Sequence, residues 1–335
     1  MDSLTQALLG AAVAGAAVPQ RHTRKALLAG ALLGTLPDLD VVIRYESAVA
    51  NFTQHRGFSH SIFVLAPFSV VLWLLLRRWW APVRDAPAPW FAAISLALLT
   101  HTLLDAHTAY GTQLLWPLET PPVMWATLFI IDPLFTLPLL LGVLLGIVWP
   151  APRRLRGALL LSTAYIGWSW VASTLVLRTA EARLADVELT APLFVTPTPF
   201  NTLLWRIVAR TPDGYLEGFD SLVAEDAGAP FISYECEDSP PGDREALDRL
   251  NWFASGLVCA AVQENQMVQA DLRMGQAPRY VFSFAVAARG EDGWEVVKPA
   301  LEPYRLEDRA LGTLWRRIWS PDPALAPKPL SDREN

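Results

Sequence analysis

The stretch WFAAISLALLTHTLLDAHTAY, residues 90–110, combines two features that decide the fold class. Its apolar run has the length that a helix needs to cross a bilayer core, roughly 17–25 residues. His101 and Asp105 stand within that run, one helical turn apart and on one helix face. Ionisable side chains at membrane depth are costly unless they are paired or bound to a metal ion. The stretch therefore predicts a membrane-spanning helix that carries part of a functional site.

Five further apolar runs have a similar or slightly shorter length, so we predict an α-helical, polytopic membrane domain with about six spans. Hydrophobic residues make up 52% of the 335 residues, which is high for a soluble enzyme. A buried helical bundle in a soluble protein is the alternative interpretation. The sequence GALLG, residues 30–34, predicts close helix packing through small residues. The predicted spans are Leu4–Val18, Ala26–Ile43, Ser61–Leu76, Trp90–Tyr110, Val123–Trp149 and Ala158–Leu177.

The distribution of charge divides the chain into two parts. Residues 1–180 contain 12 Lys/Arg and 8 Asp/Glu, whereas residues 181–335 contain 15 Lys/Arg and 25 Asp/Glu. The second part includes TLLWRIVART, YVFSFAVAA and GWEVVKP, which are typical of strands, separated by turn sequences such as TPDG. We predict a membrane domain over residues 1–178, a β-rich or α+β soluble domain over 179–320, and a disordered tail over 321–335.

Basic residues concentrate in alternate loops of the predicted membrane domain, around residues 21–25, 77–84 and 153–156. The positive-inside rule places these loops in the cytoplasm and the soluble domain on the opposite side. No cleavable signal peptide is evident in the sequence. The two cysteines, Cys236 and Cys259, would then lie in an oxidising compartment, where we expect a disulfide between them. Two buried free thiols are the alternative.

Two short motifs place polar residues at the outer boundary of this membrane domain. PDLD contributes Asp38 and Asp40 at the end of the second span, and HRGFSHS contributes His55 and His60 across a short loop. Ser59 is a candidate N-cap of the third span, which would leave His60 in its first turn. Taken singly, these residues could be a solvated helix end or interfacial histidines.

His101 and Asp105 at the end of the fourth span complete a group of six residues that the predicted topology brings together. A structural hydrogen bond is the alternative for this pair. Imidazole and carboxylate side chains predict Zn²⁺ first, with Mn²⁺ or Fe²⁺ as the alternatives, and six ligands are enough for one or two ions. The predicted ligands are Asp38, Asp40, His55, His60, His101 and Asp105.

Two further charged residues are candidates for catalysis. Arg56 lies between the two histidines of HRGFSHS, where its guanidinium could bind an anionic group of a substrate. Asp132, in IIDPLF of the predicted fifth span, is a carboxylate at membrane depth and needs a partner. Pro133 disturbs the helix next to it.

The motifs MDSLTQALLG, GTLPDLD, HRGFSHS, HTLLDAHTAYGTQLLWP and IIDPLFTLPLL together resemble the YdjM-like, LexA-regulated family of bacterial inner-membrane proteins, described as metal-dependent hydrolases. The resemblance covers roughly residues 1–178 and implies an inner-membrane location and metal ligands at the six Asp and His positions. Other members carry a histidine near the start of the chain, where this sequence has Gln6. The HxxxD element is also similar to that of zinc-dependent phospholipases C, which favours phosphoester substrates.

These observations predict a membrane-bound metal-dependent hydrolase acting on a phosphoester or other ester in a lipid or envelope small molecule. A metal-ion or proton transporter that uses the same cluster is the alternative. A transporter would need ionisable residues continuing toward the cytoplasmic side of the spans, and the sequence offers none apart from the basic loops. A non-catalytic envelope scaffold is a third possibility. The predicted partners are the lipid bilayer and this substrate, and no nucleic-acid motif is present.

Overall fold

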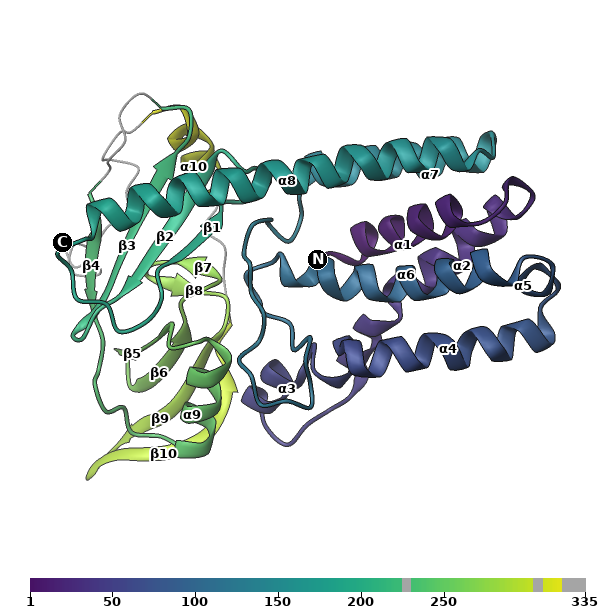
Figure 1. Ribbon diagram of the computed structural model, residues 1–335. Coiled ribbons are helices and arrows are strands. Elements are labelled where there is room, and N and C mark those ends of the chain that lie inside the picture. Colours follow the sequence, from purple (N-terminus) through teal and green to yellow (C-terminus); the bar gives the residue numbers. More distant parts are fainter. Residues whose placement is uncertain (225–229, 304–309, 321–335) are drawn as a thin grey trace. The chain divides into compact units, whose positions relative to one another are not determined.

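The computed structural model describes residues 1–224, 230–303 and 310–320 (Figure 1). The predicted disordered tail, 321–335, lies outside the described residues. The chain forms two compact units. One consists of Met1–Ile43 and His55–Ser169, and the other of Arg44–Gln54 and Trp170–Asn335. Residues 44–54, which the sequence places in an outer loop, thus belong to the second unit.

The first unit is helical. Among the described residues, three helices are long and apolar enough to cross a membrane, namely α4, α6 and α8. Helices α1 and α7 are apolar but shorter, and α2 has 13 residues, so the structure does not confirm the count of six spans. The helix bounds are α1 Ser3–Ala17, α2 Thr23–Thr35, α4 Ile62–Trp79, α5 Ala81–Asp85, α6 Pro87–Ala106, α7 Pro133–Val148 and α8 Pro152–Arg183, and the last continues into the second unit.

Helices α1 and α2 pack backbone against backbone. A Cβ atom added at Gly10 would overlap the carbonyl oxygen of Gly30 and crowd Gly34, and one added at Gly34 would meet Gln6. Only glycine permits this approach, as the GALLG sequence predicts. Around this contact, α1 is buried along almost its whole length, with Ala12 fully inaccessible to solvent.

Helix α2 ends eight residues before the predicted limit of the second span, so that prediction is wrong in extent. Pro37 cannot donate a backbone hydrogen bond and clashes with the preceding turn. The chain instead forms the 3-10 helix η2, Pro37–Val42. A second 3-10 helix, η3, covers Phe58–His60. The N-cap of α4 is Ser61, whose hydroxyl accepts from the backbone N–H of Phe63, and Ser59 is free for another role.

The second unit is β-rich, as predicted, and contains two four-stranded antiparallel sheets with strand orders β1-β2-β3-β4 and β10-β9-β6-β5. A bridge between Cys236, just after β4, and Cys259, in β5, confirms the predicted disulfide. The element bounds are α3 Ala48–Gln54, β1 Phe194–Pro197, β2 Leu204–Arg210, β3 Gly214–Ser221, β4 Ile232–Glu235, α9 Arg244–Phe253, β5 Val258–Gln263, β6 Gln266–Asp271, β7 Gly275–Gln276, β8 Arg279–Tyr280, β9 Ser283–Gly290, β10 Gly293–Leu301 and α10 Ala310–Trp319.

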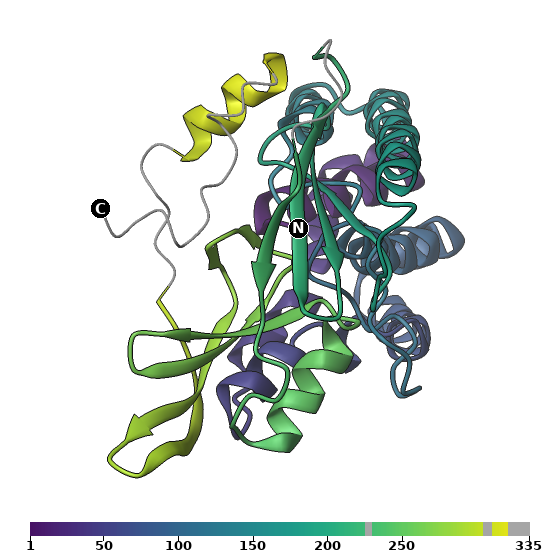
Figure 2. The same cartoon turned by 90° about the vertical axis from the view of Figure 1, so that its left-hand side faces the viewer.

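Two helices cover the first sheet from opposite sides (Figures 1 and 2). Trp205 and Ile207 of β2 pack against the end of α8, whereas Leu204 of β2 and Phe219 of β3 pack against Ile318 of α10. Successive side chains of a strand point to opposite faces, so the alternation along β2 decides which helix each face receives. The sheet therefore has a separate apolar cluster on each face, one shared with α8 and one with α10.

Candidate metal centre

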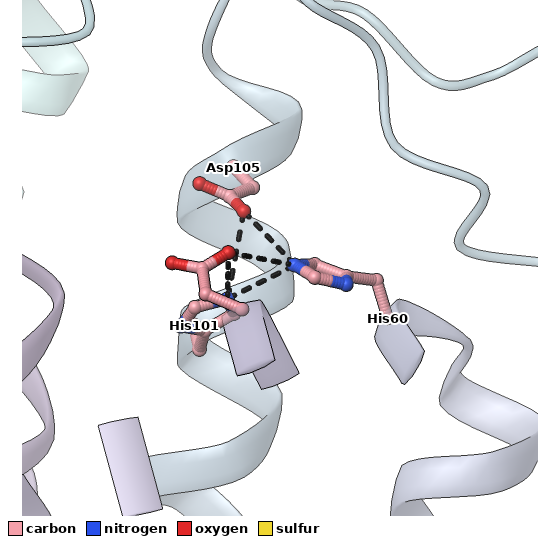
Figure 3. A group of neighbouring side chains, drawn as sticks. His60, His101 and Asp105 are labelled. Carbon is pink, nitrogen blue, oxygen red and sulfur yellow. Dashed lines mark hydrogen bonds and ion pairs between the residues drawn. The ribbon is translucent and has the colours of Figure 1, made fainter. Parts of the chain in front are cut away.

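Three chain segments of the first unit bring four of the predicted ligands together. Asp38 lies in η2, His60 ends η3, and His101 and Asp105 lie in the last turns of α6. Figure 3 shows His101 and Asp105 one turn apart on their helix, with His60 reaching them from a different segment. One nitrogen or carboxylate oxygen from each of the four residues lies within 4.8 Å of all the others.

The distances among these atoms are short and similar. His60 Nε2 lies 3.2 Å from Asp105 Oδ2 and 3.4 Å from Asp38 Oδ1. His101 Nε2 lies 3.5 Å and 3.4 Å from the same two oxygens. The two Nε2 atoms are 3.0 Å apart. His60, His101 and Asp105 have fully buried side chains, and that of Asp38 is 19% exposed. The centre is therefore shielded from water except beside Asp38.

Hydrogen bonds on the far side of each imidazole indicate its tautomer. His101 Nδ1 lies 2.6 Å from the carbonyl oxygen of Gly34, which can only accept, so Nδ1 carries the proton. Ser59 Oγ donates to Asp40 Oδ2 at 2.5 Å and therefore accepts from His60 Nδ1 at 2.9 Å. In the neutral form of each ring the lone pair is then on Nε2. Two nitrogen lone pairs and two carboxylate oxygens face one another, which is a set of acceptors that a cation satisfies.

Asp40 and His55 lie beside this group and are not among its four members. His55 Nδ1 contacts Asp40 Oδ1 at 2.7 Å, and Asp40 Oδ2 accepts from the backbone N–H of Arg56 and from Ser59. The structure thus places four of the six predicted ligands in one group, and direct metal binding by Asp40 and His55 stays a prediction. The pair supports His60 through Ser59.

The pKa shifts of Asp40 and His60 show that the surroundings of these two side chains favour positive charge. Burial would raise the pKa of Asp40, but hydrogen bonds from His55 and Ser59 outweigh burial and lower it. Burial would lower the pKa of His60, yet the carboxylates of Asp105 and Asp38 beside its Nε2 outweigh burial and raise the pKa above its ordinary value. A proton or a divalent cation can supply the charge that these carboxylates attract.

The two carboxylate oxygens of Asp105 have different surroundings. Its Oδ1 accepts from Gln6 Nε2 at 2.9 Å and also from the terminal amine of Met1. Its Oδ2 has no hydrogen-bond partner of good geometry among the described residues, although Arg56 Nε lies 3.2 Å away. A buried carboxylate oxygen without a donor fits a metal ligand, since leaving such an atom unsatisfied is costly.

Arg56, the candidate for binding an anionic group, is buried, at 4% exposure. Its guanidinium lies over the Tyr110 ring at 4.9 Å and donates to Thr108 Oγ1 at 3.0 Å. Its backbone adopts φ 60°, an uncommon conformation for a residue other than glycine. Strain of this kind is typical of functional sites, and here it turns the backbone N–H toward Asp40.

Asp132 has the contacts of a helix cap. Its Oδ1 accepts from the backbone N–H groups of Leu134 and Phe135 at the start of α7, and its Oδ2 accepts from Tyr165. It is not in the four-residue group. Its catalytic role stays a prediction. The donors that a buried carboxylate needs are supplied here by the backbone N–H groups at the start of α7.

A cavity of about 440 Å³ lies on a different face of α6 from His101 and Asp105. Leu96, Leu103 and His107 line it from α6 and its end, together with residues of α1, α7 and α8. Nδ1 of His107 contacts Thr127 Oγ1 at 2.7 Å. His107 is thus outside the metal centre, as its position two residues past Asp105 indicates.

Ser59, Gln6 and Gly34 have roles in the centre that the sequence did not reveal. Ser59 stands in the HRGFSHS motif, next to His60, but the motif fits a helix cap equally well. Gln6 is visible in the sequence only as a departure from the family pattern, and its contact with Asp105 spans 99 residues. Gly34 acts through its carbonyl oxygen, which no side-chain pattern can reveal.

The fold and the centre together define a membrane protein with apolar helices and a buried Asp/His cluster at the end of one of them. The sequence profile of the YdjM inner membrane protein family matches residues 1–176. The chain belongs to this family, as the motifs predict.

Two curated relatives are similar over part of the chain. One is the uncharacterized protein YfhP of Bacillus subtilis (strain 168), 29% identical over 140 residues, which are 40% of this chain and 42% of the relative. The other is the inner membrane protein YbcI of Escherichia coli (strain K12), 34% identical over 94 residues, which are 27% of this chain and 53% of the relative. The chain thus spans about half the length of the curated relatives it matches. No solved structure matches it.

Proposed function

We propose that this protein is a membrane-embedded, metal-dependent hydrolase whose cation is held by Asp38, His60, His101 and Asp105. The observation that carries the proposal is the convergence of two Nε2 lone pairs and two carboxylate oxygens, with both Nδ1 atoms already engaged. A metal ion bound there supplies Lewis acidity and lowers the pKa of a bound water toward about 7. The donors suit Zn²⁺, Mn²⁺ or Fe²⁺.

The number of protein donors narrows the choice of ion. Four donors leave no position for water on a tetrahedral Zn²⁺, whereas catalytic sites keep one open. Hydrolysis therefore favours an ion of higher coordination number, Mn²⁺ or Fe²⁺. Asp40 and His55 pair with each other, so the arrangement supports one ion better than two.

The other residues of the centre orient the proposed ligands and supply a positive charge. The Ser59 hydroxyl and the Gly34 carbonyl fix the two imidazole rings, and Gln6 fixes Asp105. Arg56 places a cation 3.2 Å from Asp105 Oδ2, where it can bind an anionic oxygen of a phosphoester or other ester. The substrate class is an ester in a lipid or envelope small molecule, because the site lies at the end of a helix that is apolar enough to span the bilayer.

Metal analysis of the purified protein tests the proposal, with His22 as a matched control. His22 is buried like His60 but pairs with Asp85 and Trp90. Wild type and His22→Ala should carry one divalent ion per chain, and His60→Ala should carry none. Arg56→Ala should keep the metal and lose turnover in a screen of phosphoesters and lipid esters. Wild type free of metal, or His60→Ala with unchanged metal, would contradict the centre.

The same preparation separates hydrolysis from transport. Proteoliposomes that accumulate the bound metal and turn over no ester would contradict the hydrolase and support a transporter. The proposed orientation, with the second unit outside the cytoplasm, rests on the three basic loops. A reporter fused after residue 335 should be active as a periplasmic phosphatase and dark as a cytoplasmic fluorophore, and the reverse result would overturn it.

A further inference from the structure

Helix α10 is fixed to the second unit by one of its sides. Ile318 packs with Leu204 and Phe219 of the first sheet, and Leu314 packs beside them. Ser221 Oγ donates to the backbone oxygen of Ile318 at 2.6 Å. The position of the helix on its sheet is therefore determined by apolar contact and a hydrogen bond.

A second row of apolar side chains on α10 remains in solvent. Leu311, Trp315 and Trp319 follow one another at intervals of four residues, which aligns them along the helix. Their exposed fractions are 40%, 59% and 59%, and the two indole rings are 6.3 Å apart. The exposed Arg316 borders this row. Two neighbouring tryptophans left in water are an unusual feature that marks an interaction surface.

The bilayer is the partner to which the chain itself ties the second unit. Helix α8 is a candidate span, and its residues from Trp170 onward belong to the second unit. The unit is thus tethered to the membrane, and tethering raises the effective concentration of lipid enough for weak contacts to hold. Tryptophan beside arginine is typical of helices that lie in the headgroup region.

A second copy of the chain is a poorer partner for the row. Residues 181–335 contain 15 Lys/Arg against 25 Asp/Glu, so two such units repel each other. We propose that Leu311, Trp315 and Trp319 insert into the lipid headgroup region. Helix α10 then gives the second unit an attachment to the bilayer that is independent of α8.

A fluorescent probe next to the row tests this on the full-length protein. Gly312 is exposed, and a Cβ atom there meets nothing within 4 Å, so Gly312→Cys accepts a label without disturbing the fold. The native cysteines are bridged, which leaves the new thiol as the one that reacts. Val296→Cys on β10, where the side chain is 60% exposed, is the control in the same unit.

The labelled proteins are reconstituted in phosphatidylcholine nanodiscs with or without headgroup-region doxyl lipids. We expect the doxyl lipid to quench the probe at 312 several-fold more than the probe at 296. Adding Trp315→Ala and Trp319→Ala should remove that difference while the thermal melt of the second unit is retained. Equal quenching at 312 and 296 would overturn the proposal. The proposal would also be overturned if the fluorescence of the probe at 312 changed when a second chain was present in the same disc but did not change with the doxyl lipid.

Discussion

Ser59→Ala is the substitution that best tests the geometry of the metal centre, because it removes no ligand. The Ser59 hydroxyl accepts from His60 Nδ1 at 2.9 Å and donates to Asp40 Oδ2 at 2.5 Å. Asp40 Oδ2, the carboxylate oxygen on the other side of this hydroxyl, lies 3.8 Å from His60 Nδ1, which is too far for a direct hydrogen bond. The imidazole would lose the contact that fixes its tautomer and its orientation.

The expected loss follows from that geometry. Removing the hydrogen-bond partner of a metal-binding histidine costs about 10–100-fold in metal affinity, or about 1.4–2.7 kcal/mol. The side chain of His60 is fully buried, so water does not readily replace the hydroxyl. Leaving a buried donor unpaired costs about 1–3 kcal/mol, which is similar in size to this loss of metal affinity.

The assay is competition with a chelator of known affinity, using detergent-purified protein loaded with Mn²⁺ or Zn²⁺. Ser59→Thr keeps the hydroxyl and should retain most of the affinity. Ser95→Ala, which removes a hydroxyl that bonds to Ser69 elsewhere in the first unit, should leave the affinity unchanged. Wild-type affinity in Ser59→Ala, or an equal loss in Ser95→Ala, would refute the reasoning.

Three further predictions concern packing, the disulfide and the capping aspartate. Gly10→Ala should destabilise the first unit by about 1–3 kcal/mol through overlap with α2, whereas Gly157→Ala, which meets nothing within 4 Å, should not lower the detergent melting temperature. Replacing Cys236 and Cys259 by serine should cost the second unit about 3 kcal/mol in denaturant unfolding, since the bridge closes a loop of sequence separation 23. Asp132→Ala should lose about 1 kcal/mol as a helix cap and keep its bound metal, and metal loss in this variant would place Asp132 in the centre.

The sequence alone determined the features that depend on local pattern. Apolar runs predicted the apolar helices of the first unit, although α2 ends eight residues before the end of the second predicted span and α7 begins ten residues after the start of the fifth. Alternating segments predicted strands of the second unit. PDLD, HRGFSHS and HTLLD predicted the residues of the centre, because imidazole and carboxylate groups at membrane depth are costly unless they pair or bind a cation. The family followed from the same motifs and is confirmed over residues 1–176.

Only the tertiary structure decided which of these residues face one another. His60 and His101 are 41 residues apart in the chain, and they meet because α4 packs on α6 and Thr102 Oγ1 donates to the carbonyl oxygen of His60 at 2.5 Å. The sequence also could not show which aspartate joins the four-residue group, since Asp38 and Asp40 look alike in PDLD. Asp40 is turned toward His55, Arg56 and Ser59, whereas Asp38 faces the two imidazoles. Hydrogen-bond partners that are distant in sequence fix a side chain's direction, and a local pattern carries no information about them.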